Sequence, residues 1–149
     1  MIDEATTVRD WELVAQVCHA FRSLSDAFID RIGMHRAQAA VSCRLFAQDG
    51  LTQSEIGEQL SVQGATITNM LQRMEEAELV TRRRDPEDNR LVRVYLTRPG
   101  QEKERAITGQ FLKLERAVFE GIGDEDRALF RRVLNQLLSN IENQADRSD

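Results

Sequence analysis

Arginine side chains are concentrated in one short segment of this chain, where they could bind phosphate groups. Between Arg82 and Arg98, six arginines stand against three carboxylates, so the segment carries a charge of +3. The chain as a whole has a net charge of −5. A basic segment in an acidic chain is typical of a surface that binds nucleic acid. The planar guanidinium group suits this chemistry because it forms paired hydrogen bonds to phosphates and to guanine edges.

A second group of side chains with this chemistry lies just before the arginines, on one face of a predicted helix. The face is small and polar at its start and basic further on: Ala65, Thr66, Thr68, Asn69, Gln72 and Arg73. A helix that enters the major groove, about 12 Å wide, needs small residues near its backbone and polar groups to meet the base edges. Taken alone, such a face is more typical of a surface helix in contact with water. The arginine-rich segment that follows it favours DNA.

A short helix should come before this one and pack against it. Thr52 and Glu55 have the spacing of a capping box, in which each side chain binds a free backbone amide at the helix start. We therefore expect a helix at 53–60. Gly64 then lowers the helix propensity and Ser61 offers a new cap, so the chain should turn between the two helices.

The second helix is followed by a predicted hairpin. The inward face of the helix has apolar residues spaced three and four apart, with two more at its end: Ile67, Leu71, Met74, Leu79 and Val80. Two strands are predicted at 80–84 and 91–97, the second from its alternation of apolar and polar residues. The turn-forming residues at 85–90 join them. Helix, turn, helix and basic hairpin in this order form a winged helix-turn-helix.

Four segments of this region resemble the DNA-binding core of the MarR family of bacterial transcriptional regulators: LTQSEIGEQL, GATITNMLQRMEEAELVTRR, DPEDNR and VYLTRPG. Asp88 and Arg90 in the hairpin, and the Leu-Thr-x-x-Gly motif at 96–100, have the spacing of the family's motifs. The flanking helices resemble the family in pattern only. One difference is Glu78, where the family usually has glycine, so the end of the second helix is not fixed by the resemblance.

The resemblance implies a homodimeric repressor whose two recognition helices, at 64–77, bind successive major grooves of a pseudo-palindromic operator. Arg90 is expected in the minor groove, where Asp88 would orient its guanidinium group. The full set of residues expected at the DNA is Ser54, Gly64, Ala65, Thr66, Thr68, Asn69, Arg73, Arg84, Asp88 and Arg90.

The resemblance also implies that a small aromatic or anionic effector, or an oxidant, releases the DNA. A ligand would bind in a crevice between the dimer helices and the DNA-binding lobe. The candidates to line this crevice are mostly apolar: Phe21, Phe28, His35, Cys43, Phe46 and Phe111. The alternative is that the phenylalanines are simply core residues.

Helices are predicted on both sides of the winged helix-turn-helix, from apolar residues spaced three or four apart. We expect them at about 10–32, 35–49, 101–121 and 125–144, with Gly33 and Gly50 ending the first two. Broad apolar faces at both chain ends predict a helical dimer interface. The predicted fold is one domain, mainly α with a small β-hairpin wing. Residues 10–34 and 99–146 would form the dimerisation region, and residues 35–98 the DNA-binding lobe.

Cys18 and Cys43 are the only cysteines, too few for a disulfide framework or a zinc site. Both lie beside apolar residues in helical patterns. This favours two buried, unreactive thiols. The alternative is a regulator that senses oxidants through Cys18.

The remaining sequence shows no pattern of an enzyme. It contains no phosphate-binding loop, nucleophile motif or metal-ligand spacing, so we expect no catalytic residue, no cofactor and no metal.

No apolar run reaches the roughly 18–20 residues of a membrane span, and Asp3 and Glu4 do not fit a signal peptide, so we expect a cytoplasmic protein that does not bind membranes. Three function classes stay open: a ligand- or redox-responsive DNA-binding regulator, a winged-helix protein-interaction module, and an enzyme with an unrecognised site. The basic wing favours the first.

Overall fold

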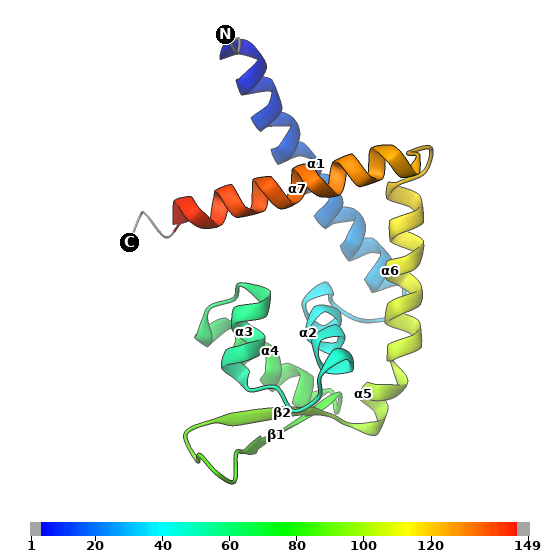
Figure 1. Ribbon diagram of the computed structural model, residues 1–149. Coiled ribbons are helices and arrows are strands. Elements are labelled where there is room, and N and C mark those ends of the chain that lie inside the picture. The colour runs from blue at the N-terminus through cyan, green and yellow to red at the C-terminus, as the bar shows by residue number, and fades with distance from the viewer. Residues whose placement is uncertain (1–3, 146–149) are drawn as a thin grey trace. The chain divides into compact units, whose positions relative to one another are not determined.

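The computed structural model describes residues 4–145, and it describes side chains from residue 9 onward. Asp3, used above in the argument about a signal peptide, and residue 146, the last residue of the expected dimerisation region, lie outside the described residues. The chain divides into two compact units, the N-terminal unit Met1–Leu114 and the C-terminal unit Glu115–Asp149. The elements in chain order are α1 (Glu4–Asp30), α2 (Arg36–Ala47), α3 (Gln53–Leu60), α4 (Gly64–Glu76), β1 (Val80–Arg84), β2 (Val92–Leu96), α5 (Arg98–Glu102), α6 (Glu104–Val118) and α7 (Asp124–Ala145) (Figure 1).

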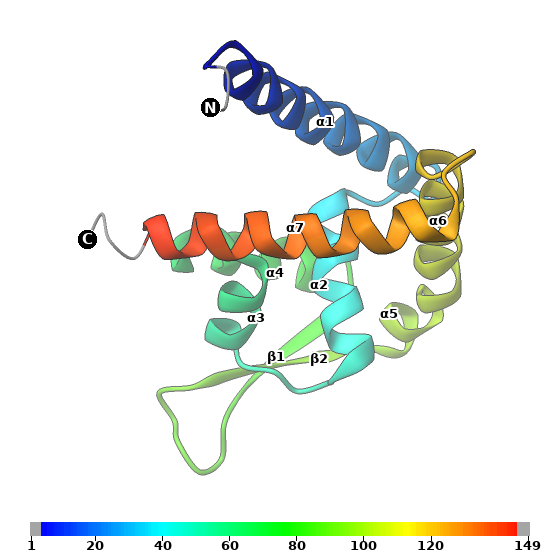
Figure 2. The ribbon, with the colours of Figure 1, turned by 45° about the horizontal axis from the view of Figure 1, so that its top comes forward.

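The predicted mainly α fold with a β-hairpin wing is confirmed. Most residues in the described range are helical, and β1 and β2 pair antiparallel with Arg82 opposite Val94. The loop between the two strands extends beyond the helices of the N-terminal unit (Figures 1 and 2). No helix within residues 4–145 combines the length and the apolar character that a membrane span requires.

One apolar core holds α2, α3, α4 and the hairpin together. Its largest fully buried apolar members come from each of these elements and also from α1 and α6: Ile29, Val41, Leu45, Ile56, Leu71, Met74, Val80, Val94 and Ile107. Burial of one such side chain contributes about 1.5–3 kcal/mol. The inward stripe predicted for α4 is therefore confirmed, and α4 is held firmly against the rest of the unit.

The connection between α3 and α4 uses the predicted capping box, but not the predicted second cap. The Thr52 amide donates to Glu55 Oε2 at 2.7 Å, and the Glu55 amide donates to Thr52 Oγ1 at 3.2 Å. Ser61 has a left-handed backbone, with φ 52°, and serves as the C-cap of α3. The residue at the N-cap of α4 is Gln63. The prediction that Ser61 caps the second helix is wrong, because its backbone is used to end the first.

Gly50 brings the chain onto the free edge of β2. Its amide donates to the Val94 carbonyl at 3.0 Å, and the Val94 amide donates to the Leu51 carbonyl at 2.9 Å. Gly50 has φ 77°, and a Cβ atom there would lie 2.8 Å from the Tyr95 ring. The predicted left-handed conformation is therefore present, but α2 already ends at Ala47, so the glycine does not cap that helix.

Two other predicted helix boundaries are wrong. Helix α1 begins at Glu4 instead of about residue 10, because residues 4–9 contain no glycine or proline to stop it. Pro99 and Gly100 lie inside the short helix α5, where proline fits the first turn, and α6 follows as a separate helix. A Cβ atom at Gly100 would lie 2.0 Å from the Leu79 carbonyl oxygen, so this close approach requires glycine.

Helix α4 ends with a left-handed residue that is not glycine. Glu78 has φ 58°, its amide donates to the Glu75 carbonyl at 2.9 Å, and the Leu79 amide donates to the Met74 carbonyl at 2.9 Å. These two bonds form a Schellman motif, in which glycine is usual at this position. The helix therefore stops before Leu79 and Val80, which had been expected to close it.

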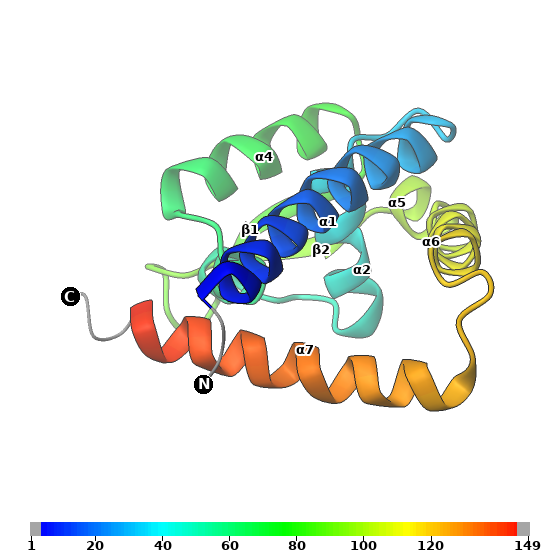
Figure 3. The ribbon, with the colours of Figure 1, turned by 90° about the horizontal axis from the view of Figure 1, so that it is seen from above.

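The C-terminal unit contains the end of α6 and a sharp corner to α7. The Phe119 and Phe130 rings meet edge to face with centroids 5.4 Å apart. The Arg127 guanidinium lies 4.5 Å from the centre of the Phe119 ring and forms an ion pair with Glu115. Helix α7 is uninterrupted (Figure 3), and none of its residues is buried within this chain.

Replacement of Glu78 by glycine should stabilise the N-terminal unit by about 0.5–1 kcal/mol. A residue with a Cβ atom pays about 1–2 kcal/mol of steric strain in the left-handed conformation, and glycine does not. This gain exceeds the backbone entropy cost of glycine, about 0.5–1 kcal/mol. Urea unfolding midpoints measure the difference. The control is Glu58→Gly, on an exposed position inside α3, which should destabilise the unit. Equal destabilisation by both substitutions would contradict the strain at Glu78.

Candidate nucleic-acid interface

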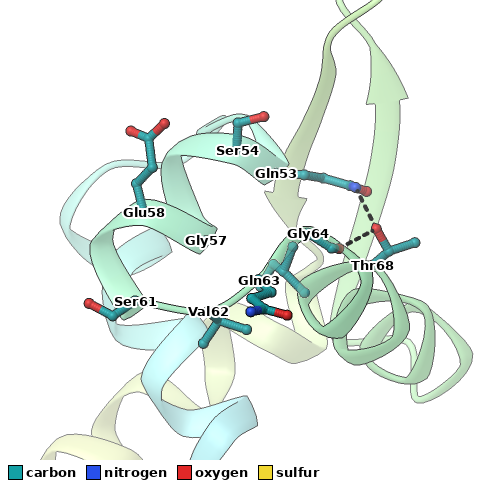
Figure 4. A pocket seen from close by; sticks show the side chains of 10 residues that line it. Gln53, Ser54, Gly57, Glu58, Ser61, Val62, Gln63, Gly64 and Thr68 are labelled. Carbon is teal, nitrogen blue, oxygen red and sulfur yellow. Dashed lines mark hydrogen bonds between the residues drawn. The ribbon is translucent and has the colours of Figure 1, made fainter. Parts of the chain in front are cut away.

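A groove of about 650 Å³ lies where α3 meets the start of α4. Its lining is mostly small and polar: Gln53, Ser54, Gly57, Glu58, Ser61, Val62, Gln63, Gly64, Ile67 and Thr68 (Figure 4). Three of the residues expected at DNA, Ser54, Gly64 and Thr68, therefore line one groove. The start of α4, where no side chain caps the backbone amides, suits a phosphate group, since free amides at helix starts attract anions.

A second groove of about 370 Å³ lies between the start of α2 and α4. It is lined by His35, Ala37, Gln38, Thr66, Asn69, Met70 and Arg73. Thr66, Asn69 and Arg73, the other polar residues expected to recognise bases, thus lie together on one side of α4. The exposed surface of α4 has a groove on each side, and Ala65 at its start is exposed between them.

Arg90 and Asp88 are paired at the tip of the wing. The Arg90 Nε atom donates to Asp88 Oδ1 and its Nη2 atom donates to Asp88 Oδ2, both at 3.1 Å. The Arg90 amide donates to the same carboxylate at 3.0 Å. Its side chain is 90% exposed. The guanidinium group is therefore held in one direction while it remains open to a ligand. The side-chain hydrogen bond from Arg90, followed by the bond from its amide, lowers the pKa of Asp88.

Asp85 organises the base of the wing. Its Oδ1 atom accepts from the Glu87 amide at 2.7 Å and from the Asp88 amide at 3.1 Å, and its Oδ2 atom pairs with Arg93. Arg93 also donates to the Gly50 carbonyl at 2.9 Å. Asp85 is only 6% exposed. The hydrogen bond from Arg93, then those from the Glu87 and Asp88 amides, lowers the pKa of Asp85.

Arg82 joins the wing to both helices of the helix-turn-helix. Its amide and its Nε atom donate to the Glu75 carboxylate at 3.0 Å each, and its Nη1 atom lies 3.5 Å from Gln53 Oε1. The amide bond from Arg82, followed by its side-chain bond, lowers the pKa of Glu75. A carboxylate on α4 is therefore tied to the first strand and, through arginine, to the start of α3.

Because of these ion pairs, the net charge of +3 between Arg82 and Arg98 overstates the number of arginines that are free to bind phosphate. Of the six arginines between residues 82 and 98, four pair with carboxylates in the described structure: Arg82, Arg90, Arg93 and Arg98. Arg84 donates to the Asn89 carbonyl at 2.8 Å, and Arg83 lies 5.7 Å from the Tyr95 ring centre. Arg83 and Arg84 are exposed. The structural roles of Arg82 and Arg93 were not predicted. Glu75 and Asp85 were possible partners in the sequence, but which arginine each carboxylate meets depends on the packing of α4 against β1 and on the pairing of the two strands.

The residues expected around an effector are spread over several environments. Phe28 is buried, and Cys43, Phe46 and Phe111 pack against the core of the N-terminal unit. Phe21 is 48% exposed on α1. His35 is exposed at the N-cap of α2, beside the second groove. The structure therefore brings four of the six into the core region and separates Phe21 and His35 from them.

The two cysteines differ in their surroundings. Cys43 is half-buried, and burial raises the pKa of its thiol, which favours the neutral form. Cys18 is exposed. The prediction that both thiols are buried is thus wrong for Cys18 within a single chain, because its apolar neighbours Val14, Val17 and Phe21 on α1 are themselves exposed. Among the side chains that the structure describes, those of residues 9–145, no cluster of three His, Cys, Asp or Glu residues could hold a metal ion.

Comparison with known proteins finds relatives among transcriptional regulators. A model of the MarR family matches residues 35–92, from the start of α2 to the start of β2. The organic hydroperoxide resistance transcriptional regulator of Bacillus subtilis is 34% identical over 105 residues, which cover 68% of this chain and 71% of that protein. The HTH-type transcriptional repressor YetL of the same organism is 32% identical over 92 residues, covering 61% of this chain and 54% of the repressor.

One of the solved structures similar to this chain is a complex with DNA. The crystal structure of the S. aureus MepR-DNA complex is similar to this chain with a TM-score of 0.80 and 27% sequence identity. The similarity covers 87% of this chain and 96% of that one. The arrangement of helices and wing described above is thus one that a related protein uses in a complex with DNA.

Substitution of Asp85 by asparagine should destabilise the fold at neutral pH, and the difference from the wild type should shrink in acid. A carboxylate whose pKa is lowered by folding contributes stability above its unfolded pKa, about 3.9, and this contribution is lost as pH falls through the folded pKa. Urea midpoints of both proteins between pH 7 and pH 3 measure this. The control is Glu87→Gln, at an exposed position in the same turn, which should leave the urea midpoint at neutral pH close to that of the wild type. A constant gap between Asp85→Asn and wild type at every pH would show that the charge of Asp85 does not matter.

Proposed function

Since this chain belongs to the MarR family of DNA-binding transcriptional regulators, we propose that it acts as a homodimeric repressor of a pseudo-palindromic operator and that a small effector releases it. The observation that carries this proposal is the Asp88–Arg90 pair. It holds an exposed guanidinium group at the tip of a wing whose first strand packs against α4, a helix with a polar outer face. A related protein named as a repressor, YetL, supports the direction of regulation.

The proposed DNA contacts follow from the positions of these side chains and from the chemistry of the DNA grooves. Helix α4 would lie in the major groove, where Asn69 can form paired hydrogen bonds with adenine and Arg73 can bind guanine or phosphate. Ser54 and Gly64 would face the phosphate backbone from the first groove, together with Arg84 on the wing. Arg90 would enter the minor groove, whose negative potential attracts an oriented guanidinium group.

The dimer is proposed from two apolar faces that are unusually exposed. On α1 the exposed apolar side chains are Trp11, Leu13, Val14, Val17, Phe21 and Leu24. On α7 they are Leu129, Phe130, Val133, Leu134, Leu137, Leu138 and Ile141. On globular proteins, large contiguous apolar faces that are exposed usually mark sites of interaction with another protein. We therefore assign residues 10–34 and 99–146 to dimerisation and residues 35–98 to DNA binding.

The effector is proposed to be a small aromatic or anionic molecule. Its site would use a mostly apolar set that includes Phe28, Cys43, Phe46 and Phe111, of which Cys43, Phe46 and Phe111 are only partly buried. Oxidation is a second candidate signal, because Cys18 is exposed and one relative is named as an organic hydroperoxide resistance regulator. The only tyrosine, Tyr95, lies in β2, away from Cys18 in the sequence, so no tyrosine hydroxyl on α1 can assist this thiol.

DNA duplexes selected by the wild-type protein from a random pool should contain two half-sites about one helical turn apart. Binding should fall by about 10³–10⁵ between 50 and 200 mM salt if the dimer makes six to ten phosphate contacts. Arg90→Ala should weaken binding about tenfold or more, because a hydrogen bond to a charged group contributes about 1.5–3 kcal/mol. The sequences of the selected duplexes give the half-site spacing, and fluorescence anisotropy with one of these duplexes gives the affinities. Failure to enrich any sequence would contradict the proposal.

Two further variants belong to that experiment. If Asp88 only repels DNA, Asp88→Ala should tighten binding; if Asp88 orients Arg90, the same variant should weaken it, which is the result we expect. The control is Arg98→Ala, which removes an equally exposed arginine after the wing, 89% exposed and paired with Glu102. It should weaken binding less than Arg90→Ala. An equal loss from both arginine variants would show that total charge, not the wing tip, determines affinity.

The two candidate signals are separated by the same assay. We expect a phenolic acid to release the DNA from wild type and from Cys18→Ser alike, because the apolar effector site does not include Cys18. Organic hydroperoxide at low concentration should leave both complexes intact. Release by hydroperoxide that is lost in Cys18→Ser would instead make oxidation the signal.

A further inference from the structure

The hydroxyl group of Thr68 is already occupied by protein partners. Its Oγ1 atom donates to the Gly64 carbonyl, one helical turn earlier, at 2.9 Å. The same oxygen accepts a long hydrogen bond from Gln53 Nε2 at 3.4 Å. A hydroxyl has a single proton to donate. Thr68 therefore has no proton left for a base edge, although its side chain is exposed on α4.

Gln53 is held in turn by charged groups. Its Oε1 atom lies 3.5 Å from Arg82 Nη1, and Arg82 Nη2 lies 2.9 Å from Glu75 Oε2. Guanidinium groups only donate, so the amide oxygen of Gln53 must face Arg82 and its NH₂ group must face Thr68. This fixes the direction of the amide and, with it, the donor that Thr68 meets.

These bonds select one rotamer of Thr68. Threonine in a helix ordinarily divides between two χ1 rotamers. Here the hydroxyl points toward Gln53 and Gly64, and the methyl group points the opposite way, out of the groove (Figure 4). The surface that Thr68 presents is therefore apolar, although threonine is counted among polar residues in a sequence.

We propose that Thr68 recognises thymine by contact of its methyl group with the C5-methyl group of the base, and that Gln53 is a positioning residue for this contact. Threonine methyl groups are suited to this recognition in the major groove. The inference rests on the proposed DNA binding and adds to it the base type and the atom that recognises it. It differs from recognition by the hydroxyl, which the polar character of the residue would suggest.

The test uses duplexes that wild-type protein selects from a random pool. Each thymine is replaced in turn by deoxyuridine, which lacks only the C5-methyl group. At one thymine in each half-site, the replacement should weaken binding about fourfold, the contribution of one buried methyl group. Fluorescence anisotropy gives the ratio of the two dissociation constants at that position.

Two single substitutions then separate the methyl from the hydroxyl group. Thr68→Val keeps a methyl group in the single rotamer that valine prefers in helices, so the thymine preference should remain. Thr68→Ser keeps the hydroxyl and removes the methyl group, so the preference should disappear. The control is Thr108→Ser, on an exposed position of α6 outside the DNA-binding lobe, which should not change the ratio.

The role of Gln53 is tested in two backgrounds. Gln53→Ala should reduce the thymine preference when residue 68 is threonine, because the second rotamer becomes accessible. The same substitution should have no effect on the preference in Thr68→Val, since valine does not need the amide. Loss of preference in both backgrounds would show that Gln53 acts on the fold or on DNA directly, and would overturn its positioning role.

The remaining outcomes are distinct. Preference retained in Thr68→Ser and lost in Thr68→Val would show that the hydroxyl recognises the base and would overturn the proposal. Selected duplexes in which no thymine is sensitive to deoxyuridine would overturn it while leaving DNA binding intact. Failure of the protein to select any duplex would refute the proposed function itself.

Discussion

The geometry of the wing depends on one buried carboxylate, that of Asp85. It accepts two amide hydrogen bonds from the turn and one ion pair from Arg93, which also binds the Gly50 carbonyl. A buried carboxylate without partners would be costly, so the turn, β2 and the connection from α2 to α3 must adopt their positions together. The direction of the wing tip, and with it the position of Arg90, follows from this network.

The same use of charge continues along the hairpin. Arg82 is occupied by Glu75 and Arg93 by Asp85, so these side chains fix the wing against the helices and are not available to DNA as free cations. Fewer arginines can therefore bind phosphate than the total charge of the segment indicates. The exposed ones on the hairpin are Arg83, Arg84 and Arg90. The proposed interface therefore depends on where a few guanidinium groups are held, more than on how many there are.

The sequence predicted those features that are encoded within a few residues. The capping box of Thr52 and Glu55, the inward stripe of α4 and the limits of β1 were correct, because each depends on local spacing. Features that join distant segments were not predicted. Arg93 and Gly50 meet across 43 positions, and their contact depends on the register of β2. The left-handed backbone of Glu78 was not predicted, because glutamate disfavours this conformation; the glycine usual in the family at this position was the one sign of it. The exposure of Cys18 was likewise not predicted, because the spacing of apolar residues along α1 does not show whether another part of the chain covers that face.

The hydrogen-bonded chain from Glu75 through Arg82 and Gln53 to Thr68 lies wholly within the N-terminal unit. Its members are on α3, α4 and β1, which share one apolar core with buried residues from each element. A close-packed core of this kind moves as a body, since deforming it would open voids or strain side chains. An effector that changed the spacing between two such lobes in a dimer would therefore displace the recognition surface without altering the rotamer of Thr68 or the direction of Arg90. Regulation of affinity and recognition of sequence would then rest on different parts of the chain, which allows either to change without loss of the other.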